Sequence, residues 1–161
     1  IFIRETHNPA MGMSAFDRNI KKLTGQAPLY VLGPLCCDAA PGYDHIAGAI
    51  GAAQAVEAGA DFLCYLTPAE HLTLPDEADV RAGVLASRIA AHVGEIALKR
   101  PQALAREAGM NKARMALDWG GMGSNALDPR TLQERRKAHK DEEVCAMCGK
   151  FCAVKMLRAK G

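Results

Sequence analysis

Three of the six cysteines lie close together near the end of this 161-residue chain, in the run Cys145-Ala-Met-Cys148-Gly-Lys-Phe-Cys152. Thiolates at this spacing are typical of a metal or iron–sulfur site. A four-iron, four-sulfur (4Fe-4S) cluster with three protein thiolates keeps one iron free of protein ligation, and that iron can bind S-adenosylmethionine and pass it one electron. The spacing therefore favours a cluster for radical chemistry over zinc, because a second Cys-x-x-Cys pair is absent.

Two other interpretations of the cysteines stay open. One is a structural zinc knuckle with His139 or a distant group as fourth ligand. The other is three thiols without metal in a mobile tail, since the linker from Arg130 to Val144 is strongly charged and nearly devoid of large apolar residues. The remaining cysteines, Cys36, Cys37 and Cys64, do not have the pattern of a disulfide framework, so we expect a reducing cytoplasm.

Composition excludes several function classes. Apolar residues make up 49% of the chain, which suits a folded core, and the net charge of +2 predicts no binding to nucleic acid or to a membrane surface. The basic run 135–140 is followed by three acidic residues, so we interpret it as a solvated helix face or a linker. No apolar run reaches the roughly 18 residues of a membrane span. The chain opens on Ile1-Phe2-Ile3 without an initiator methionine, and we interpret it as the last part of a longer protein.

Strand and helix patterns alternate in the first hundred residues. The apolar runs 29–35 and 61–66 predict buried strands, and helices are predicted from Asp44 to Gly59 and from the cap at Asp76 to about Lys99. The expected apolar faces of these two helices are Ile46, Ile50, Ala53 and Val56, and Leu85, Ile89, Val93 and Ile96.

Helices alone follow Pro101. Residues 102–122 form one helix or two short ones, and Asp128-Pro129 caps and opens another. The fold class is therefore α/β with a parallel sheet, followed by an α-helical segment and a cysteine-rich tail. Two strand–helix units and the end of a third strand at residues 1–3 cannot close an eight-stranded barrel, which needs roughly 250 residues.

Polar side chains follow each expected strand where the strand ends. They are His7 after the first, Asp38, Tyr43, Asp44 and His45 after the second, and Glu70 and His71 after the third. The carboxyl ends of parallel strands line one pocket, so we expect these residues to converge. His7 and His71 predict a two-imidazole site for zinc or a similar ion, although each alone is more often a structural histidine. Asp38 and Asp44 also have a structural interpretation, as turn and helix N-cap residues, and for Asp44 it is weighed equally with a functional role.

The chain resembles the phosphomethylpyrimidine synthases, or thiamine pyrimidine synthases, from about His7 to Lys155. The motifs that carry the resemblance are Leu-Tyr-Val-Leu-Gly-Pro-Leu at 29–35, Asp-Ala-Ala-Pro-Gly-Tyr-Asp-His-Ile at 38–46, Leu-Cys-Tyr-Leu-Thr-Pro-Ala-Glu-His-Leu at 63–72 and the cysteine run. The resemblance implies a homodimer with a (β/α)8 barrel core. We accordingly expect residues 1–100 to be the last part of that barrel, 101–137 a helical segment and 138–161 the cluster-binding tail.

The resemblance also implies a reaction and its cofactors. The family uses S-adenosylmethionine to rearrange 5-aminoimidazole ribotide into 4-amino-5-hydroxymethyl-2-methylpyrimidine phosphate, with an electron donor such as flavodoxin or ferredoxin. Residue by residue, Cys145, Cys148 and Cys152 match the ligands of the 4Fe-4S cluster, His7 and His71 match two zinc-binding histidines, and Tyr30 matches a substrate-binding tyrosine. The resemblance assigns no catalytic residue.

Some positions depart from the family pattern. Ile3 stands where the family usually has a glutamate, and Gly120-Gly121-Met122 replaces polar residues after Trp119. The compact cysteine spacing resembles family members of anaerobes and archaea, including 5-hydroxybenzimidazole synthases of cobamide (vitamin B12) biosynthesis, which use the same ribotide. Two further alternatives are an inactive paralogue and an iron–sulfur protein for electron transfer or binding. No fourth cysteine lies near the run, which argues against simple electron transfer.

Overall fold

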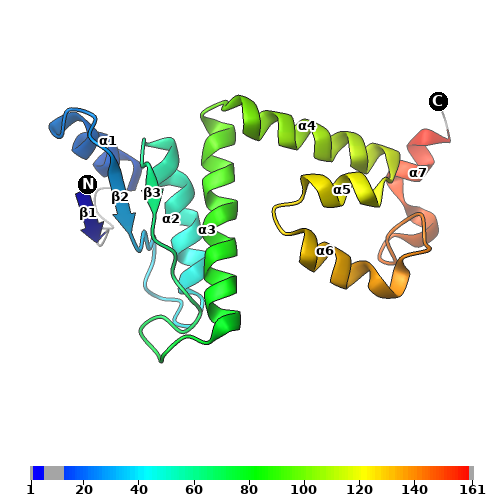
Figure 1. Cartoon of the computed structure of the whole chain (residues 1–161), viewed down its shortest axis with the longest axis horizontal. Coiled ribbons are helices and arrows are strands. Elements are labelled where there is room, and N and C mark those ends of the chain that lie inside the picture. The colour runs from blue at the N-terminus through cyan, green and yellow to red at the C-terminus, as the bar shows by residue number, and fades with distance from the viewer. Residues whose placement is uncertain (1, 6–12, 160–161) are drawn as a thin grey trace. The chain divides into compact units, whose positions relative to one another are not determined.

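The structure, a computed structural model, describes residues 2–5 and 13–159. The chain divides into two compact units, unit 1 (Ile1–Arg100) and unit 2 (Pro101–Gly161) (Figure 1). Among the described residues, no helix is both long enough and apolar enough to cross a membrane.

Unit 1 is built on a parallel sheet in the order β1 (Phe2–Glu5), β2 (Leu29–Leu32) and β3 (Phe62–Leu63). Tyr30 is the register partner of both Ile3 and Phe62. Helices α1 (Met13–Leu23), α2 (Asp44–Glu57) and α3 (Glu77–Ala97) follow the strands in turn. The predicted alternation of strands and helices and the predicted α/β class are confirmed, whereas α1 was not predicted and the strands predicted at 29–35 and 61–66 are shorter than expected.

Helices α2 and α3 lie side by side (Figure 1) and contact each other through small residues. A Cβ atom on Gly94 of α3 would lie 2.5 Å from the Cβ of Val56, and the buried positions of α2 are mainly alanines and glycines. The predicted apolar faces are therefore only in part the ones through which α2 and α3 contact each other. Ile46 and Ile50 of α2 are 49% and 52% exposed, and Ile89 and Val93 of α3 are 47% and 49% exposed. Periodicity selected the large side chains, but close helix packing selects the small ones.

An ion pair joins α1 to the start of the sheet. Lys21 Nζ lies 2.8 Å from Asp61 Oδ2, and the same carboxylate oxygen accepts a hydrogen bond from the backbone N–H of Leu29 at 2.8 Å. The hydrogen bond from Lys21 is the main cause that lowers the pKa of Asp61. These contacts fix where β2 and β3 begin, next to a core of Leu29, Val31 and Ala55.

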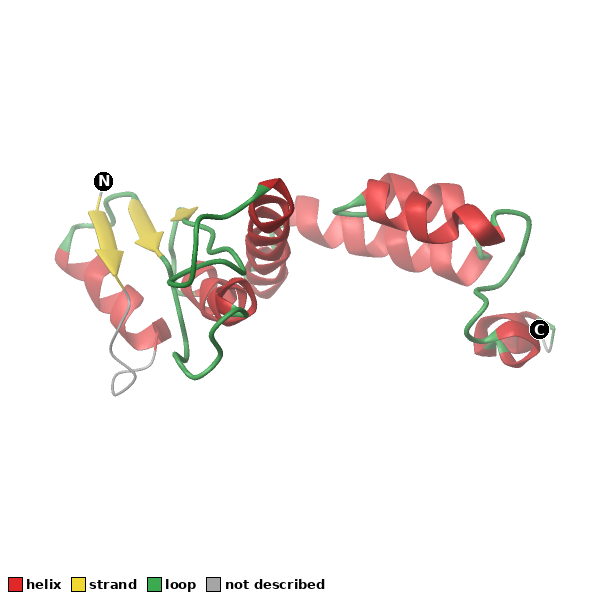
Figure 2. Cartoon of the chain, turned by 90° about the horizontal axis from the view of Figure 1, so that it is seen from below, coloured by secondary structure: helices red, strands yellow, loops and turns green. Residues whose placement is uncertain are grey.

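Unit 2 is helical among the described residues. Helices α4 (Pro101–Ala116) and α5 (Trp119–Asn125) contact each other (Figure 1), and α6 (Pro129–Arg136) continues into the short helix η1 (Lys137–His139). Figure 2 shows unit 2 as helices joined by loops. The backbone N–H of Thr131 donates to the carboxylate of Asp128 at 3.2 Å, so the predicted cap of α6 is confirmed. The cysteine run contains η2 (Gly149–Phe151) and leads into α7 (Ala153–Arg158).

Candidate functional site

A pocket of about 480 Å³ opens where β2 and β3 end. In a parallel sheet this edge is where ligands bind. Two of the predicted site residues, Glu70 and His71, line the pocket together with residues that the sequence did not single out. The full lining is Leu32, Gly33, Leu35, Cys64, Tyr65, Leu66, Glu70 and His71.

His71 stands at the mouth of this pocket in an unusual backbone conformation. Its φ of 60° is in the left-handed region, which residues other than glycine seldom adopt and which is common at functional sites. Its side chain is 68% exposed, and its Nδ1 lies 3.6 Å from Oδ2 of Asp44. Asp44 is buried in the first turn of α2, where the helix dipole favours a carboxylate. A carboxylate beside one ring nitrogen is the usual support of a metal-binding histidine. The other predicted ligand, His7, lies outside the described residues.

Tyr30 on β2 contacts a cysteine that sequence reasoning did not place in the site. The hydrogen bond to the Cys64 thiol is the main cause that raises the pKa of Tyr30, and burial adds to it. Tyr30 pairs in register with Phe62, and Cys64 lies two residues beyond Phe62. Because side chains alternate along a strand, register and alternation together give the signal that places Tyr30 and Cys64 on one face.

The other predicted residues lie at different depths. Glu70 accepts a long hydrogen bond of 3.5 Å from the backbone N–H of Thr67. The buried Thr67 hydroxyl has no hydrogen-bond partner among the described residues, and Thr67 is not one of the residues that line the pocket. Tyr43 is 61% exposed at the start of α2, and Asp38 is exposed in the loop before it. Neither lines the pocket, so the structure does not bring them together with the others.

The cysteine run forms a tight turn in unit 2. The backbone N–H of Gly149 donates to the carbonyl of Cys145 at 3.0 Å, and Gly149 has a positive φ of 49°. The sulfur of Cys145 accepts hydrogen bonds from the backbone N–H and then the thiol of Cys148, and these lower the pKa of Cys145. The same pairing raises the pKa of Cys148, while Cys152 is buried. Backbone N–H groups directed at a cysteine sulfur suit a thiolate that binds a metal or cluster.

The described residues do not gather three cysteine, histidine, aspartate or glutamate side chains into a metal site. Cys145 and Cys148 are paired, and Cys152 is near enough for its charge to act on Cys148. His139, the alternative zinc ligand, instead places its Nδ1 2.8 Å from Oε1 of Glu142. The donor set of this turn therefore fits soft thiolate coordination at two positions, with a third thiol close by.

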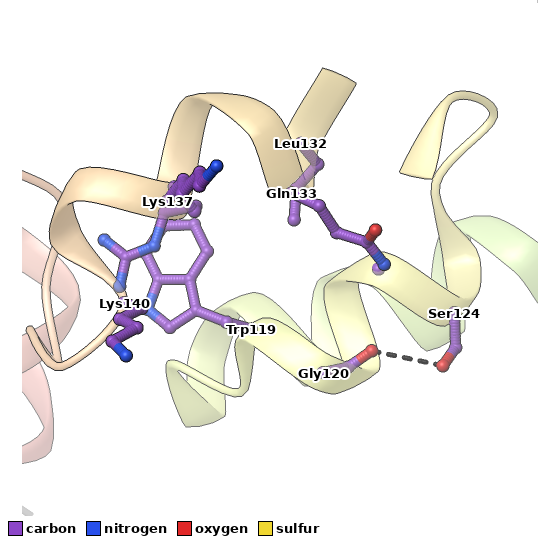
Figure 3. A pocket seen from close by; sticks show the side chains of 9 residues that line it. Trp119, Gly120, Ser124, Leu132, Gln133, Lys137 and Lys140 are labelled. Atoms are coloured by element: carbon purple, nitrogen blue, oxygen red, sulfur yellow. Dashed lines mark hydrogen bonds between the residues drawn. The ribbon is translucent and has the colours of Figure 1, made fainter. Parts of the chain in front are cut away.

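Beside the cysteine turn, a groove of about 540 Å³ runs between α5, α6 and η1 (Figure 3). Trp119, Gly120 and Ser124 line one side, and the Ser124 hydroxyl donates to the Gly120 carbonyl at 3.1 Å. Lys137 and Lys140 line the other side. The sequence predicted that the basic run is a solvated helix face or a linker. The structure adds a contact that this prediction lacked: the Arg136 guanidinium lies 3.8 Å from the ring centroid of Trp119.

Comparison with known proteins agrees with this arrangement of motifs. Residues 6–159 match the family described as "Radical SAM ThiC family". The chain is 48% identical over 153 residues to phosphomethylpyrimidine synthase of Fusobacterium nucleatum, covering 92% of this chain and 35% of that protein. It is 52% identical over 139 residues to phosphomethylpyrimidine synthase of Moorella thermoacetica, covering 85% of this chain and 32% of the relative. It is 49% identical over 153 residues to phosphomethylpyrimidine synthase 1 of Methanosarcina barkeri, covering 94% and 36%. The chain thus spans about a third of the length of these relatives, and it belongs to the Radical SAM ThiC family.

Proposed function

We propose that the whole protein is a radical S-adenosylmethionine enzyme, a carbon–carbon lyase of thiamine biosynthesis, which converts 5-aminoimidazole ribotide into 4-amino-5-hydroxymethyl-2-methylpyrimidine phosphate. Family membership together with a cysteine turn whose backbone N–H groups point at a ligand sulfur carries this proposal. The names of the relatives favour the pyrimidine product over 5-hydroxybenzimidazole.

In this proposal Cys145, Cys148 and Cys152 hold a 4Fe-4S cluster. Such a cluster supplies, when bound, one-electron reduction of S-adenosylmethionine at an iron free of protein ligation. The chain's own contribution is to stabilise the Cys145 thiolate by backbone N–H groups and to bury Cys152 away from water. The backbone N–H groups favour the Cys145 thiolate, and burial limits the access of water and oxidant to Cys152.

The pocket of unit 1 is the proposed substrate and metal region. Tyr30, which is hydrogen-bonded to Cys64, donates a hydrogen bond from its hydroxyl to the substrate, and Cys64 and Glu70 line the pocket. His71 binds zinc or a similar divalent ion together with His7, and Asp44 orients the His71 ring. The left-handed backbone of His71 supports this role, because strain of this kind is retained where function requires a fixed side chain.

Unit 1 is proposed to be the last part of a (β/α)8 barrel, residues 101–137 a helical segment and residues 138–161 the cluster tail. The parallel strand–helix order and the exposed isoleucines Ile46 and Ile50 of α2 support a larger α/β fold that covers them. The resemblance further suggests a homodimer in the cytoplasm that receives electrons from flavodoxin or ferredoxin.

An anaerobic product assay tests the reaction. The whole protein is incubated with the ribotide, S-adenosylmethionine and a reductant, and the products are separated and identified by mass spectrometry. We expect the pyrimidine phosphate and 5′-deoxyadenosine from the wild type, and neither from a folded Cys148→Ser variant. Formation of 5-hydroxybenzimidazole would replace the proposed product. A loaded protein that does not cleave S-adenosylmethionine would instead be an electron-transfer or binding protein.

A further inference from the structure

The segment Glu142–Val144, directly before Cys145, is held through its backbone by two side chains from neighbouring helices. Trp119 of α5 donates its Nε1–H to the carbonyl of Glu143 at 2.9 Å. Arg136 of α6 donates to the carbonyl of Glu142 at 2.6 Å and to that of Val144 at 3.3 Å. Three consecutive carbonyls therefore accept hydrogen bonds from side chains, although two of the three residues are exposed glutamates.

The two donors also stabilise each other. The guanidinium of Arg136 lies over the indole of Trp119 at 3.8 Å from the ring centroid, and Trp119 lines the groove shown in Figure 3. A planar guanidinium can stack on a ring and use its two outer nitrogens as a fork, which a lysine cannot do. The carbonyl positions of Glu142 and Val144 match the two arms of that fork.

The same segment is bound from the other side of the cysteines. The carboxylate of Glu143 lies 2.5 Å from Nζ of Lys155 and 3.7 Å from a guanidinium nitrogen of Arg158, both on α7. Arg158 also donates to the carbonyl of Ala116, at the end of α4, at 3.2 Å. Glu143 precedes the first cysteine and Lys155 follows the last, so this ion pair closes the loop that carries all three thiols.

Exposed ion pairs are individually weak and sensitive to salt. Here, however, the ion pair acts together with three hydrogen bonds to backbone carbonyls, whose strength depends little on salt. Contacts that close a loop remove conformations that the metal-free loop would otherwise occupy. A metal site that is ordered in advance does not need to spend binding free energy on ordering its ligands.

We propose that Trp119, Arg136, Lys155 and Arg158 form a clasp on Glu142–Val144 that keeps the cysteine loop folded before any cluster is inserted. The proposal rests on the proposed role of the three cysteines as cluster ligands. It differs from the sequence-based interpretation of three metal-free thiols in a mobile tail. The charged linker has few large apolar side chains for docking, and the clasp docks its last residues through their backbone instead.

Thiol alkylation in the whole, reduced, chelator-treated protein tests the clasp without requiring a cluster. A short pulse of iodoacetamide followed by peptide mass spectrometry gives a rate for each cysteine, with Cys36 and Cys37 of unit 1 as internal references. In the wild type we expect the buried Cys152 to react at least about tenfold more slowly than the exposed Cys148.

Two variants each keep the type of side chain, a cation or an aromatic ring, and remove one of its contacts with the backbone carbonyls. Arg136→Lys keeps the charge but loses the fork, and Trp119→Phe keeps a ring for stacking but loses the N–H donor. We expect both to raise the Cys152 alkylation rate about three- to tenfold and to slow anaerobic iron uptake. Arg135→Lys is the matched control on the same helix, and it should match the wild type in both measurements.

Equal Cys152 rates in Arg136→Lys, Trp119→Phe and Arg135→Lys would overturn the clasp. Should the first two variants fail to fold by circular dichroism, Glu143→Gln decides the matter, because it changes one exposed carboxylate. Glu143→Gln should raise the alkylation rate of Cys152 in low salt, and adding 1 M KCl should not raise the rate of this variant any further. A low-salt alkylation rate equal to that of the wild type would contradict the proposal. A protein with a protected Cys152 that never takes up iron would retain the clasp and refute the cluster instead.

Discussion

The packing of α2 against the loop after β2 depends on a missing side chain at Gly51. A Cβ atom at this position would overlap the backbone carbonyl oxygen of Pro34, which is fully buried between β2 and the pocket residue Leu35. A backbone oxygen cannot rotate away as a flexible side chain can. Gly51→Ala therefore forces α2 to move, and we expect the loop that forms one pocket wall to move with it.

The magnitude follows from two opposing effects. Overpacking of a tight contact costs about 1–3 kcal/mol, and an overlap with backbone belongs at the upper end of that range. Replacing a glycine inside a helix by alanine contributes about 1 kcal/mol of helix propensity in the other direction. The net expectation for Gly51→Ala is a loss of about 2 kcal/mol in the local stability of unit 1, since the two effects only partly offset each other.

Hydrogen exchange measured by mass spectrometry reports this loss where it occurs. A loss of about 2 kcal/mol predicts roughly thirtyfold faster exchange in peptides that cover β2 and α2. Gly123→Ala in α5 is the matched control, because its Cβ would meet nothing within 4 Å and the helix should gain stability. If both variants changed exchange equally, or if Gly51→Ala left residues 29–35 unaffected, the close approach would not be the reason for this glycine.

Three further outcomes are expected. Asp61→Asn should destabilise unit 1 by about 1–2 kcal/mol near neutral pH. Because the ion pair with Lys21 lowers the folded-state pKa of Asp61, its contribution is complete above the ordinary value of 3.8 and is lost as the pH falls through the lower folded value, so the difference between wild type and variant should disappear in acid unfolding curves. His71→Asn should remove a bound divalent ion from the whole protein, measured by elemental analysis, and unchanged metal content would show that the histidine is structural. Tyr30→Phe should raise KM for the ribotide about tenfold while leaving the free energy of unfolding nearly unchanged, and an unchanged KM would leave Tyr30 as a partner of Cys64 alone.

Local signals in the sequence predicted the helix boundaries well. Asp76 and Asp128 are N-caps whose carboxylates accept the expected backbone hydrogen bonds, and α2 begins at Asp44 as predicted. Such signals work because a cap is satisfied by residues within one turn. The buried faces of α2 and α3 were harder to predict. How closely two helices approach depends on small residues such as glycine at their tertiary contact, and the periodicity of apolar residues does not report this.

The sequence predicted those site residues whose position follows from the order of the strands along the chain. Glu70 and His71 were expected at the strand ends because topology alone puts them there. The clasp could not be predicted, because Trp119, Arg136 and Glu143 come from separate segments and its acceptors are backbone carbonyls, which every residue has. Charge pattern suggested a solvated linker, and only the folded arrangement gives Arg136 a ring to stack on.

Iron analysis of the anaerobically reconstituted whole protein tests the central claim most directly. Reconstitution with iron and sulfide should give about four irons and four sulfides per chain, with an electron paramagnetic resonance signal in the reduced state that changes when S-adenosylmethionine is added. Cys148→Ser should abolish that change while circular dichroism stays the same. Stoichiometric zinc, no iron uptake and an intact cysteine tail would contradict the account and leave Cys145, Cys148 and Cys152 as a structural zinc site.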